Sequence, residues 1–401
     1  KFGSRHKKIV NTMNINLYFN PVDAEYLSLE ALPEDSLSRR VLINTDERTI
    51  DMDMTNIVAD MAIVGVRGES ESKESRICSA DVIRKQLYSL KQHRKSLRLV
   101  DFGNLKSGRT RKDTYAALAE VCNILLRNRV IPIILAQDND MAVGNYTAYE
   151  QIGQLINVFN IDSEIDFADI KDGITNHNFL NYLFCNQPNY LFNYTHVAYQ
   201  SYLVSHSMID LMHRMKFETY RLGEIQNKIE TTEPLVRNAD MFMADVSSLR
   251  ASDAPCSKNP HGLYGEEFCK IVNFAGMSDK LTSMGLYGYK AEDDIDCRTA
   301  KLLSHALWYF IEGYNWRKND YPYKDQTNYY KFNVIMSDDR TIVFYKSKKS
   351  ERWWMQVSCP DDLQQKYLRH FLVPCTYNDY NEAMQGNLPD RWLLAYSKLN
   401  L

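Results

Sequence analysis

Short apolar runs alternate with longer amphipathic stretches from about residue 59 to residue 316. The apolar runs are rich in Val, Ile, Leu, Phe or Tyr and lack a regular polar alternation, which is typical of strands buried on both faces of a parallel sheet. We predict eight such strands, at residues 59–66, 96–103, 129–136, 155–161, 189–199, 218–225, 239–246 and 281–289.

The longer stretches place apolar residues three or four positions apart, as a helix with one face on a sheet requires. They predict helices at residues 79–93, 112–128, 208–215, 265–276 and 299–314. About eight alternations of strand and helix indicate an α/β protein, either a doubly wound three-layer sandwich or a barrel. The pattern alone leaves both architectures open.

Both ends of the chain depart from this alternation. Residues 1–58 contain irregular or helical surface, and we expect them to pack on the core formed by residues 59–316. Residues 317–401 are an aromatic-rich C-terminal extension of α+β character, which we also expect to pack on the core. The elements predicted in this extension are antiparallel strands at 329–335, 340–349 and 352–360 and a helix at 389–399.

The composition is that of an ordinary globular protein, with 44% hydrophobic residues, 25% charged residues and a net charge of −3. This balance gives no indication of a nucleic-acid partner, and no apolar run reaches the roughly 20 residues that span a bilayer. Because no stretch resembles a signal peptide, we expect a cytoplasmic protein. The eight cysteines are widely spaced, which favours reduced thiols over a zinc site or disulfides.

Polar and acidic side chains follow three of the predicted strands. "QDND" follows the strand at 129–136, "DSEID" follows the strand at 155–161, and "DVSSLRASDAP" ends the strand at 239–246. In an open α/β sheet the carboxyl ends of the strands meet at one edge, where ligands bind. Crowded carboxylates at this edge repel one another unless a cation offsets their charge. The sequence therefore predicts a cation site.

The order and spacing of these segments, over about residues 55–315, resemble the ureohydrolase superfamily, which includes arginase, agmatinase and formimidoylglutamase. Members of that superfamily end the same three strands with GGxH, DAHxD and DxDxxDP, and the ligands in these motifs hold two manganese ions. In this chain Asn139 stands at the first histidine position. "DSEID" keeps Asp162 and Asp166 and places Glu164 where the central histidine belongs.

The third motif departs further from the family pattern. "ADVSSLRASDAP" keeps Asp245 but carries Ser247 and Arg250 at the two later aspartate positions. By resemblance, the chain is formimidoylglutamase-like with degraded metal motifs. The resemblance also implies the arginase-like fold, a three-layer α/β/α sandwich on a mostly parallel eight-stranded sheet.

These departures change the metal site that the resemblance implies. The ligands of the first ion are expected to be Asn139, Asp162, Asp166 and Asp245. The second ion would need Glu164, Asp162, Asp245 and Ser247, and a neutral hydroxyl is a poor replacement for a bridging carboxylate. Oxygen ligands suit manganese, magnesium or calcium better than zinc. We therefore expect one divalent cation or none.

Arg250 is expected to pair with Asp162, Asp245 or Glu164 and to supply the charge of a missing metal ion. A guanidinium at this position also makes Arg250 a candidate substrate-binding residue.

Two further residues are candidates for substrate chemistry. "NPHGLYGEEF" resembles a family stretch that places Glu267 against the guanidino group of the substrate, although Glu267 also suits the first turn of a helix. His177, in the loop after the acidic motif, is a candidate general acid or an ordinary surface residue. In an active hydrolase Asp162 and Asp245 would carry the metal-bound nucleophile. Alternatively, Asp162 and Asp166 cap the next helix.

We expect a ureohydrolase-like pseudoenzyme with an incomplete dinuclear site, which binds a small amidine or guanidino ligand or a protein partner. One alternative is a metal-dependent hydrolase of C–N bonds in linear amidines, of the formimidoylglutamase or arginase type. Another is a structural subunit of a larger assembly that uses the C-terminal extension as its contact surface. The resemblance also implies a homo-oligomer.

Overall fold

The computed structural model describes residues 14–50, 53, 57–72, 75–171, 173–322, 326–336 and 340–400. Part of the predicted N-terminal segment, including residues 1–13, lies outside the described residues. In the described part of the chain, no helix is long and apolar enough to cross a membrane. The boundaries proposed at residues 58 and 316 remain predictions.

All eight predicted strands form, and they lie side by side in one parallel run with the order β4-β3-β5-β10-β9-β6-β7-β8. Their bounds are β3 (Met61–Val66), β4 (Leu99–Leu105), β5 (Ile131–Ala136), β6 (Ile156–Ile161), β7 (Leu191–Tyr199), β8 (Glu218–Arg221), β9 (Met241–Asp245) and β10 (Ser283–Tyr287). The N-terminal segment adds β1 (Phe19–Asn20), antiparallel to β4, and β2 (Val41–Ile43), parallel to it. The sheet therefore has ten strands instead of the eight expected, and it is open instead of closed into a barrel.

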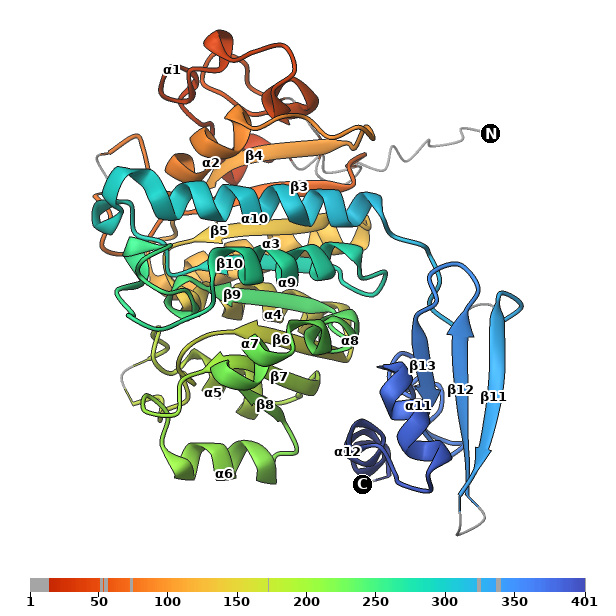
Figure 1. Ribbon diagram of the computed structural model, residues 1–401. Coiled ribbons are helices and arrows are strands. Elements are labelled where there is room, and N and C mark those ends of the chain that lie inside the picture. The colour runs from red at the N-terminus through yellow and green to blue at the C-terminus, as the bar shows by residue number, and fades with distance from the viewer. Residues whose placement is uncertain are drawn as a thin grey trace, which may run out of the picture.

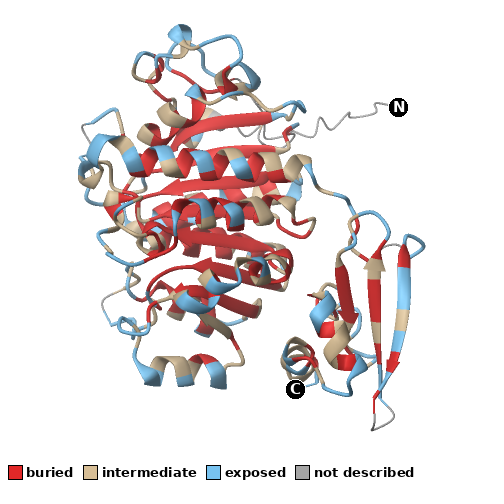
Figure 2. Ribbon diagram, in the orientation of Figure 1, coloured by how far each residue is buried: buried red, intermediate tan, exposed pale blue. Residues whose placement is uncertain are grey.

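Helices cover both faces of this sheet, which gives the three-layer sandwich (Figure 1). Ile133 and Leu135 of β5 belong to one apolar cluster, whereas Ile134 and Ala136 of the same strand belong to the other. Both faces of the central strands are therefore buried, as Figure 2 shows. The first cluster packs under α2 (Ser79–Ser89), α7 (Leu222–Asn227), α8 (Thr232–Arg237), α9 (Gly265–Met277) and α10 (Arg298–Asn315). The second packs under α3 (Arg111–Arg127), α4 (Ala142–Ile152), α5 (Phe179–Cys185) and α6 (His206–Arg214).

The sequence prediction omitted four helices of the core, α4, α5, α7 and α8. Helix α4 is buried on nearly all sides, so its sequence has no polar stripe to mark a helical period. The strand predicted at 218–225 ends at Arg221, and α7 begins at the next residue. A short helix, α1 (Ala24–Leu27), completes the N-terminal segment.

The C-terminal extension forms a four-stranded antiparallel sheet with two helices (Figure 1). Phe344, Met355 and Trp392 belong to a small apolar core of its own. The strands, in sheet order, are β11 (Tyr329–Ile335), β12 (Thr341–Ser347), β13 (Trp353–Gln356) and β14 (Leu372–Cys375), and the helices are α11 (Tyr377–Met384) and α12 (Asp390–Leu399).

The extension docks on the edge of the core where the parallel strands begin. Arg237, at the end of α8, donates to the carbonyls of Trp353 (3.1 Å) and Cys375 (3.2 Å). Asp240, directly before β9, pairs with Arg369 of the extension. These contacts lie at the amino ends of the strands.

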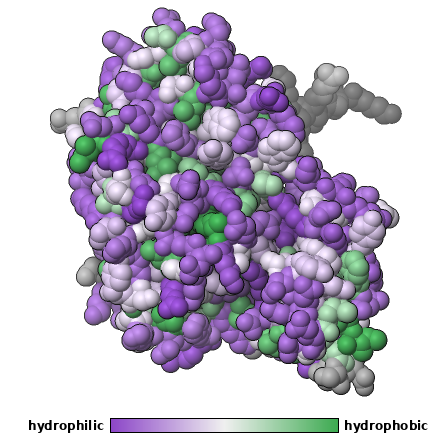
Figure 3. Space-filling model, in the orientation of Figure 1, coloured by the Kyte–Doolittle hydropathy of each residue, from purple (hydrophilic) through white to green (hydrophobic). Residues whose placement is uncertain are grey.

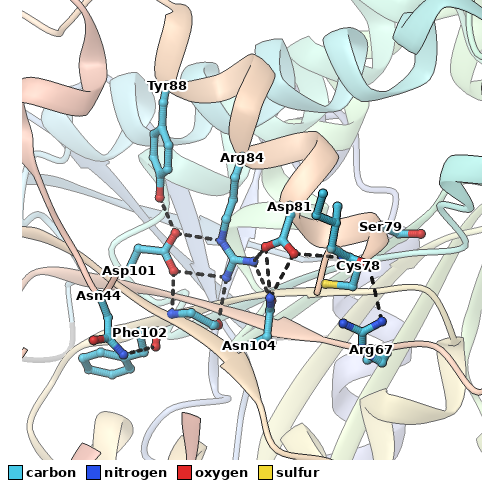
Figure 4. Close-up of polar contacts among 12 residues, drawn as sticks. Asn44, Arg67, Cys78, Ser79, Asp81, Arg84, Tyr88, Asp101, Phe102 and Asn104 are labelled. Atoms are coloured by element: carbon cyan, nitrogen blue, oxygen red, sulfur yellow. Dashed lines mark hydrogen bonds and ion pairs between the residues drawn. The ribbon is translucent and has the colours of Figure 1, made fainter. Parts of the chain in front are cut away.

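A buried ion network fixes α2 to β4 (Figure 4). Arg84 of α2 is 0% exposed, and its guanidinium donates twice to Asp101, at 2.7 and 3.0 Å, and once to Asp81, at 2.9 Å. It also donates to the Asn104 side chain at 2.6 Å. A Cβ at Gly65 would lie 2.1 Å from the Asn104 oxygen, so glycine is required at this point of β3. The network therefore constrains two neighbouring strands and a helix.

Replacing Arg84 with methionine is expected to lower the free energy of unfolding by about 3–5 kcal/mol, because two buried carboxylates lose their positive partner. Urea unfolding measures this loss. Arg98→Met is the matched control, since Arg98 pairs with Asp60 at 2.7 Å on the surface and is 59% exposed. This control should change stability little. Equal losses in the two variants would contradict a structural role for the network.

Candidate functional site

Three of the predicted site residues meet at the carboxyl edge of the sheet. Asp162 directly follows β6, and Asp245 is the last residue of β9, the strand that pairs with β6. Asn139 begins a short 3-10 helix just after β5, which lies on the other side of β10. Parallel pairing therefore brings segments more than 100 residues apart to one place.

Short hydrogen bonds join the two carboxyls. The Ser247 hydroxyl donates to Asp162 Oδ1 at 2.6 Å, and the Ser247 amide donates to Asp245 Oδ1 at 2.6 Å. Gly288, with φ +80°, leaves room for the Asp245 carboxyl, because a Cβ there would lie 2.4 Å from its Oδ2. A hydroxyl therefore binds an Asp162 oxygen at a position where ureohydrolases are expected to carry a metal-binding carboxylate.

Burial and mutual repulsion raise the pKa values of the acidic groups. Burial, with the charges of Asp245 and Asp166, raises the pKa of Asp162 well above its ordinary value. Burial, with the charges of Asp245 and Glu164, raises the pKa of Asp166 to about 7, against hydrogen bonds from Asn139 and Asp162. Burial also raises the pKa of Asp245. The ionised cluster is therefore costly without a positive partner.

Among the described residues, no lysine or arginine forms an ion pair with these three aspartates; the nearest cationic candidate is His177, whose Nδ1 lies 3.8 Å from Asp166 Oδ1. His177 itself is exposed. We call Asp162, Asp166 and Asp245 the acidic cluster. It is buried, apart from a side-chain exposure of 12% at Asp166.

One arginine binds both acids of the neighbouring turn, which the sequence did not indicate. Arg111 of α3 pairs with Asp138 at 2.9 Å and donates to Asp140 at 2.9 Å, on either side of Asn139. These partners lie far apart in the sequence and form no local motif. Arg111 therefore offsets part of the negative charge of this turn, whereas the acidic cluster has no such partner among the described lysines and arginines.

The expected pairing of Arg250 with the acidic cluster or Glu164 is wrong. Its guanidinium donates to Asp253 at 2.9 Å and stacks 3.8 Å from the centre of the Tyr264 ring. The residue lines a surface pocket of about 700 Å³ between α9 and α10. A cation–π contact and a carboxylate three residues away hold it there, so it does not supply the missing metal charge.

Two other predicted residues lie outside the buried cluster. Glu164 is exposed. Glu267 accepts the backbone amide of Tyr264 at 2.9 Å and the Gln226 side chain at 3.3 Å, so it caps α9, as its alternative interpretation suggested. Its contact with a substrate remains a prediction.

The residues present do not match a dinuclear metal site. Asn139 and Ser247 stand where charged or imidazole ligands are expected, and Glu164 is turned to solvent. In the part of the chain that the structure describes, no group of three or more His, Cys, Asp or Glu is arranged to hold a metal ion. The donor set of the acidic cluster with Asn139 is all oxygen, which suits a hard cation such as manganese, magnesium or calcium.

No protein-family model matches the chain. A formimidoylglutamase from Staphylococcus haemolyticus is 22% identical over 281 residues, which are 63% of this chain and 87% of that protein. A solved formiminoglutamase from Trypanosoma cruzi with Mn²⁺ matches with a TM-score of 0.57 and 18% identity, over 65% of this chain and 94% of that one. An arginase from Medicago truncatula matches with a TM-score of 0.52 and 16% identity, over 64% of this chain and 87% of that one.

The core of this chain therefore has the arginase-like α/β/α fold of the ureohydrolases, with a C-terminal antiparallel sheet added to it. Among the ureohydrolases it resembles the formimidoylglutamases, which confirms the resemblance found in its sequence.

Replacing Asp166 with asparagine is expected to stabilise the metal-free protein by about 1 kcal/mol, because one of three crowded buried acids is removed. Thermal unfolding at pH 8 in chelator measures this change. Asp253→Asn is the control, since Asp253 pairs with Arg250 and its neutralisation should not stabilise the fold. A destabilised Asp166→Asn protein would show that the cluster is already compensated.

Proposed function

We propose that this protein is a ureohydrolase-like binding protein whose acidic cluster receives the positively charged amidinium or guanidinium group of a small ligand directly. The observation that carries the proposal is the charge surplus of the cluster. Asp162, Asp166 and Asp245 are gathered at the ligand-binding edge of the sheet, and the expected internal counter-ion, Arg250, pairs elsewhere.

An amidinium suits this cluster for geometric reasons. Its planar N–H groups donate in parallel to carboxylate oxygens, and charge-assisted bonds of this kind are stronger than neutral ones. Asp166 is the most exposed of the three acids, and His177 lies beside it. We infer that a ligand enters at Asp166, with His177 near its polar end. The Asn139 amide adds a polar contact to this site without adding charge.

The face of the molecule covered by α9 and α10 is mainly hydrophilic, with hydrophobic residues in small separate patches (Figure 3). Contiguous apolar area usually marks a protein interface, so this face carries no such mark. The alternative of a structural subunit, and the expected homo-oligomer, remain predictions.

The second candidate is a metal-dependent hydrolase of linear amidines. The similarity to formimidoylglutamases, one of them solved with Mn²⁺, favours it. Asp162, Asp166, Asp245 and Asn139 are the residues that would hold a single ion, which in such enzymes supplies a polarised hydroxide for attack on the amidine carbon. In that case His177 would hold or donate a proton beside Asp166.

Titration calorimetry with agmatine and acetamidine in chelator tests the proposal, because both probes carry the cationic group and lack an α-carboxylate. Binding is expected without metal, and Asp162→Asn should weaken it at least tenfold through loss of a charged hydrogen-bond acceptor. Asp253→Asn is the control variant and should leave binding unchanged. Binding or ammonia release that appears only with manganese would overturn the proposal in favour of the hydrolase, and no binding under either condition would refute both.

A further inference from the structure

One edge of the small sheet in the C-terminal extension is open. The strand order β11-β12-β13-β14 makes β11 and β14 its edge strands, and β11 is the outermost strand of the extension in Figure 1. β14 contains Pro374 and is held by the core, because Arg237 donates to the Cys375 carbonyl at 3.2 Å. In the described part of the chain, no segment pairs with the outer side of β11.

β11 lacks the features that usually protect an edge strand from pairing with another chain. Proteins protect such edges with short strands, proline, bulges or charged side chains. The edge strands of the large sheet, β1, β2 and β8, have two, three and four residues. β11 has seven residues and no proline, and its register with β12 is unbroken from Tyr329 to Ile335. Lys331 is its single charged residue.

The hydrogen bonds to β12 determine which backbone groups of β11 face outward. The Asn328 carbonyl accepts the Lys348 amide at 2.9 Å, and the Met336 amide donates to the Arg340 carbonyl at 2.7 Å. Bonded positions alternate along an antiparallel pair, so the even-numbered residues of β11 bond to β12. The N–H and C=O groups that point away from β12 therefore belong to Lys331, Asn333 and Ile335.

We propose that β11 pairs with β11 of a second copy of this chain. The two strands run antiparallel about a twofold axis at Phe332, which joins the two four-stranded sheets into one continuous sheet. In this register the residues with outward-pointing backbone groups lie opposite one another, as their hydrogen bonds require. The opposed pairs are Tyr329–Ile335, Tyr330–Val334, Lys331–Asn333 and Phe332–Phe332.

The side chains of β11 favour a second copy as the partner, because the strand is complementary to itself in this register. Tyr330 is 56% exposed and Ile335 is 74% exposed in the single chain, and each lies opposite an apolar residue of the other copy. Lys331 lies opposite the neutral Asn333, so no like charges face each other. Aromatic and β-branched residues paired in this way stabilise neighbouring strands.

The pair of seven-residue strands is smaller than a standard protein interface. We therefore expect a reversible dimer whose population depends on protein concentration. This association is independent of the ligand proposed for the acidic cluster.

Sedimentation equilibrium of the full chain, at micromolar to several hundred micromolar protein, measures the Kd of this dimer. Asn333→Lys places two like-charge pairs across the axis, each with Lys331, and should raise the Kd about fivefold or more. Lys331→Glu alone is the matched control, since it faces the neutral Asn333 and should change the Kd little. Combined with Asn333→Lys, it creates opposite-charge pairs and should restore the dimer.

Asn333→Pro is a second, independent variant. It removes an outward N–H that makes no bond to β12, and proline is tolerated on edge strands, so the fold should be kept while the dimer is lost. An unchanged melting temperature of the dilute protein checks that the fold is kept.

Three results would overturn the proposal. The first is a chain that stays monomeric at several hundred micromolar. The second is a dimer or larger assembly that both Asn333→Lys and Asn333→Pro leave unchanged, which would place the contact on another surface. The third is weakening by Asn333→Lys that Lys331→Glu does not reverse, because the two residues would then not face each other.

Discussion

The parallel pairing of the strands decides what lies at each edge of this sheet. Polar turns gather at the carboxyl ends of the strands, and the C-terminal extension docks at their amino ends. Every strand in the run from β4 to β8 ends at the same edge, so the polar turns that follow β5, β6 and β9 are forced together. The amino ends lie at the opposite edge, where the C-terminal extension docks. Ligand chemistry at one edge and domain contact at the other follow from one constraint of topology.

Buried carboxylates elsewhere in the chain show what the acidic cluster lacks. Arg84 binds both carboxylates between α2 and β4, Arg111 binds both acids of the turn after β5, and Arg369 pairs with the carboxylate before β9. Most of these pairs join different elements, and the Arg84–Asp81 pair joins residues three positions apart in α2. The acidic cluster accepts hydrogen bonds from neutral groups, among them the hydroxyl and backbone amide of Ser247 and the side-chain amide of Asn139. Burial and mutual repulsion raise the pKa values of these three acids, and the proposed cationic ligand, or a metal ion, would lower the cost of ionising them.

The sequence predicted the fold well because burial on both faces leaves a local signal. Continuous apolar runs marked all eight strands of the parallel run, and amphipathic stretches marked five helices. Helix α4 was missed because it has no polar face, and β1 and β2 were missed because two or three residues carry no period.

The sequence predicted only those site residues whose positions are determined by the ends of the strands. Asp162 and Asp245 meet because their strands pair, which the motif order already implied. The direction of a long side chain could not be predicted, because it depends on neighbouring residues that no local sequence pattern specifies. Arg250 contacts Asp253 and Tyr264, and Arg111 pairs with the turn after β5 although no local motif links the two segments.

The number of metal ions bound per chain shows whether the dinuclear site is incomplete. Mass spectrometry of protein purified without chelator, exposed to manganese and then desalted, gives the number of ions per chain. We expect one manganese ion or none, because the neutral Ser247 hydroxyl is a poor replacement for the bridging carboxylate that a second ion needs and Glu164 is exposed. Two manganese ions per chain would contradict it and would establish that the residues at this edge of the sheet rearrange into a complete dinuclear centre.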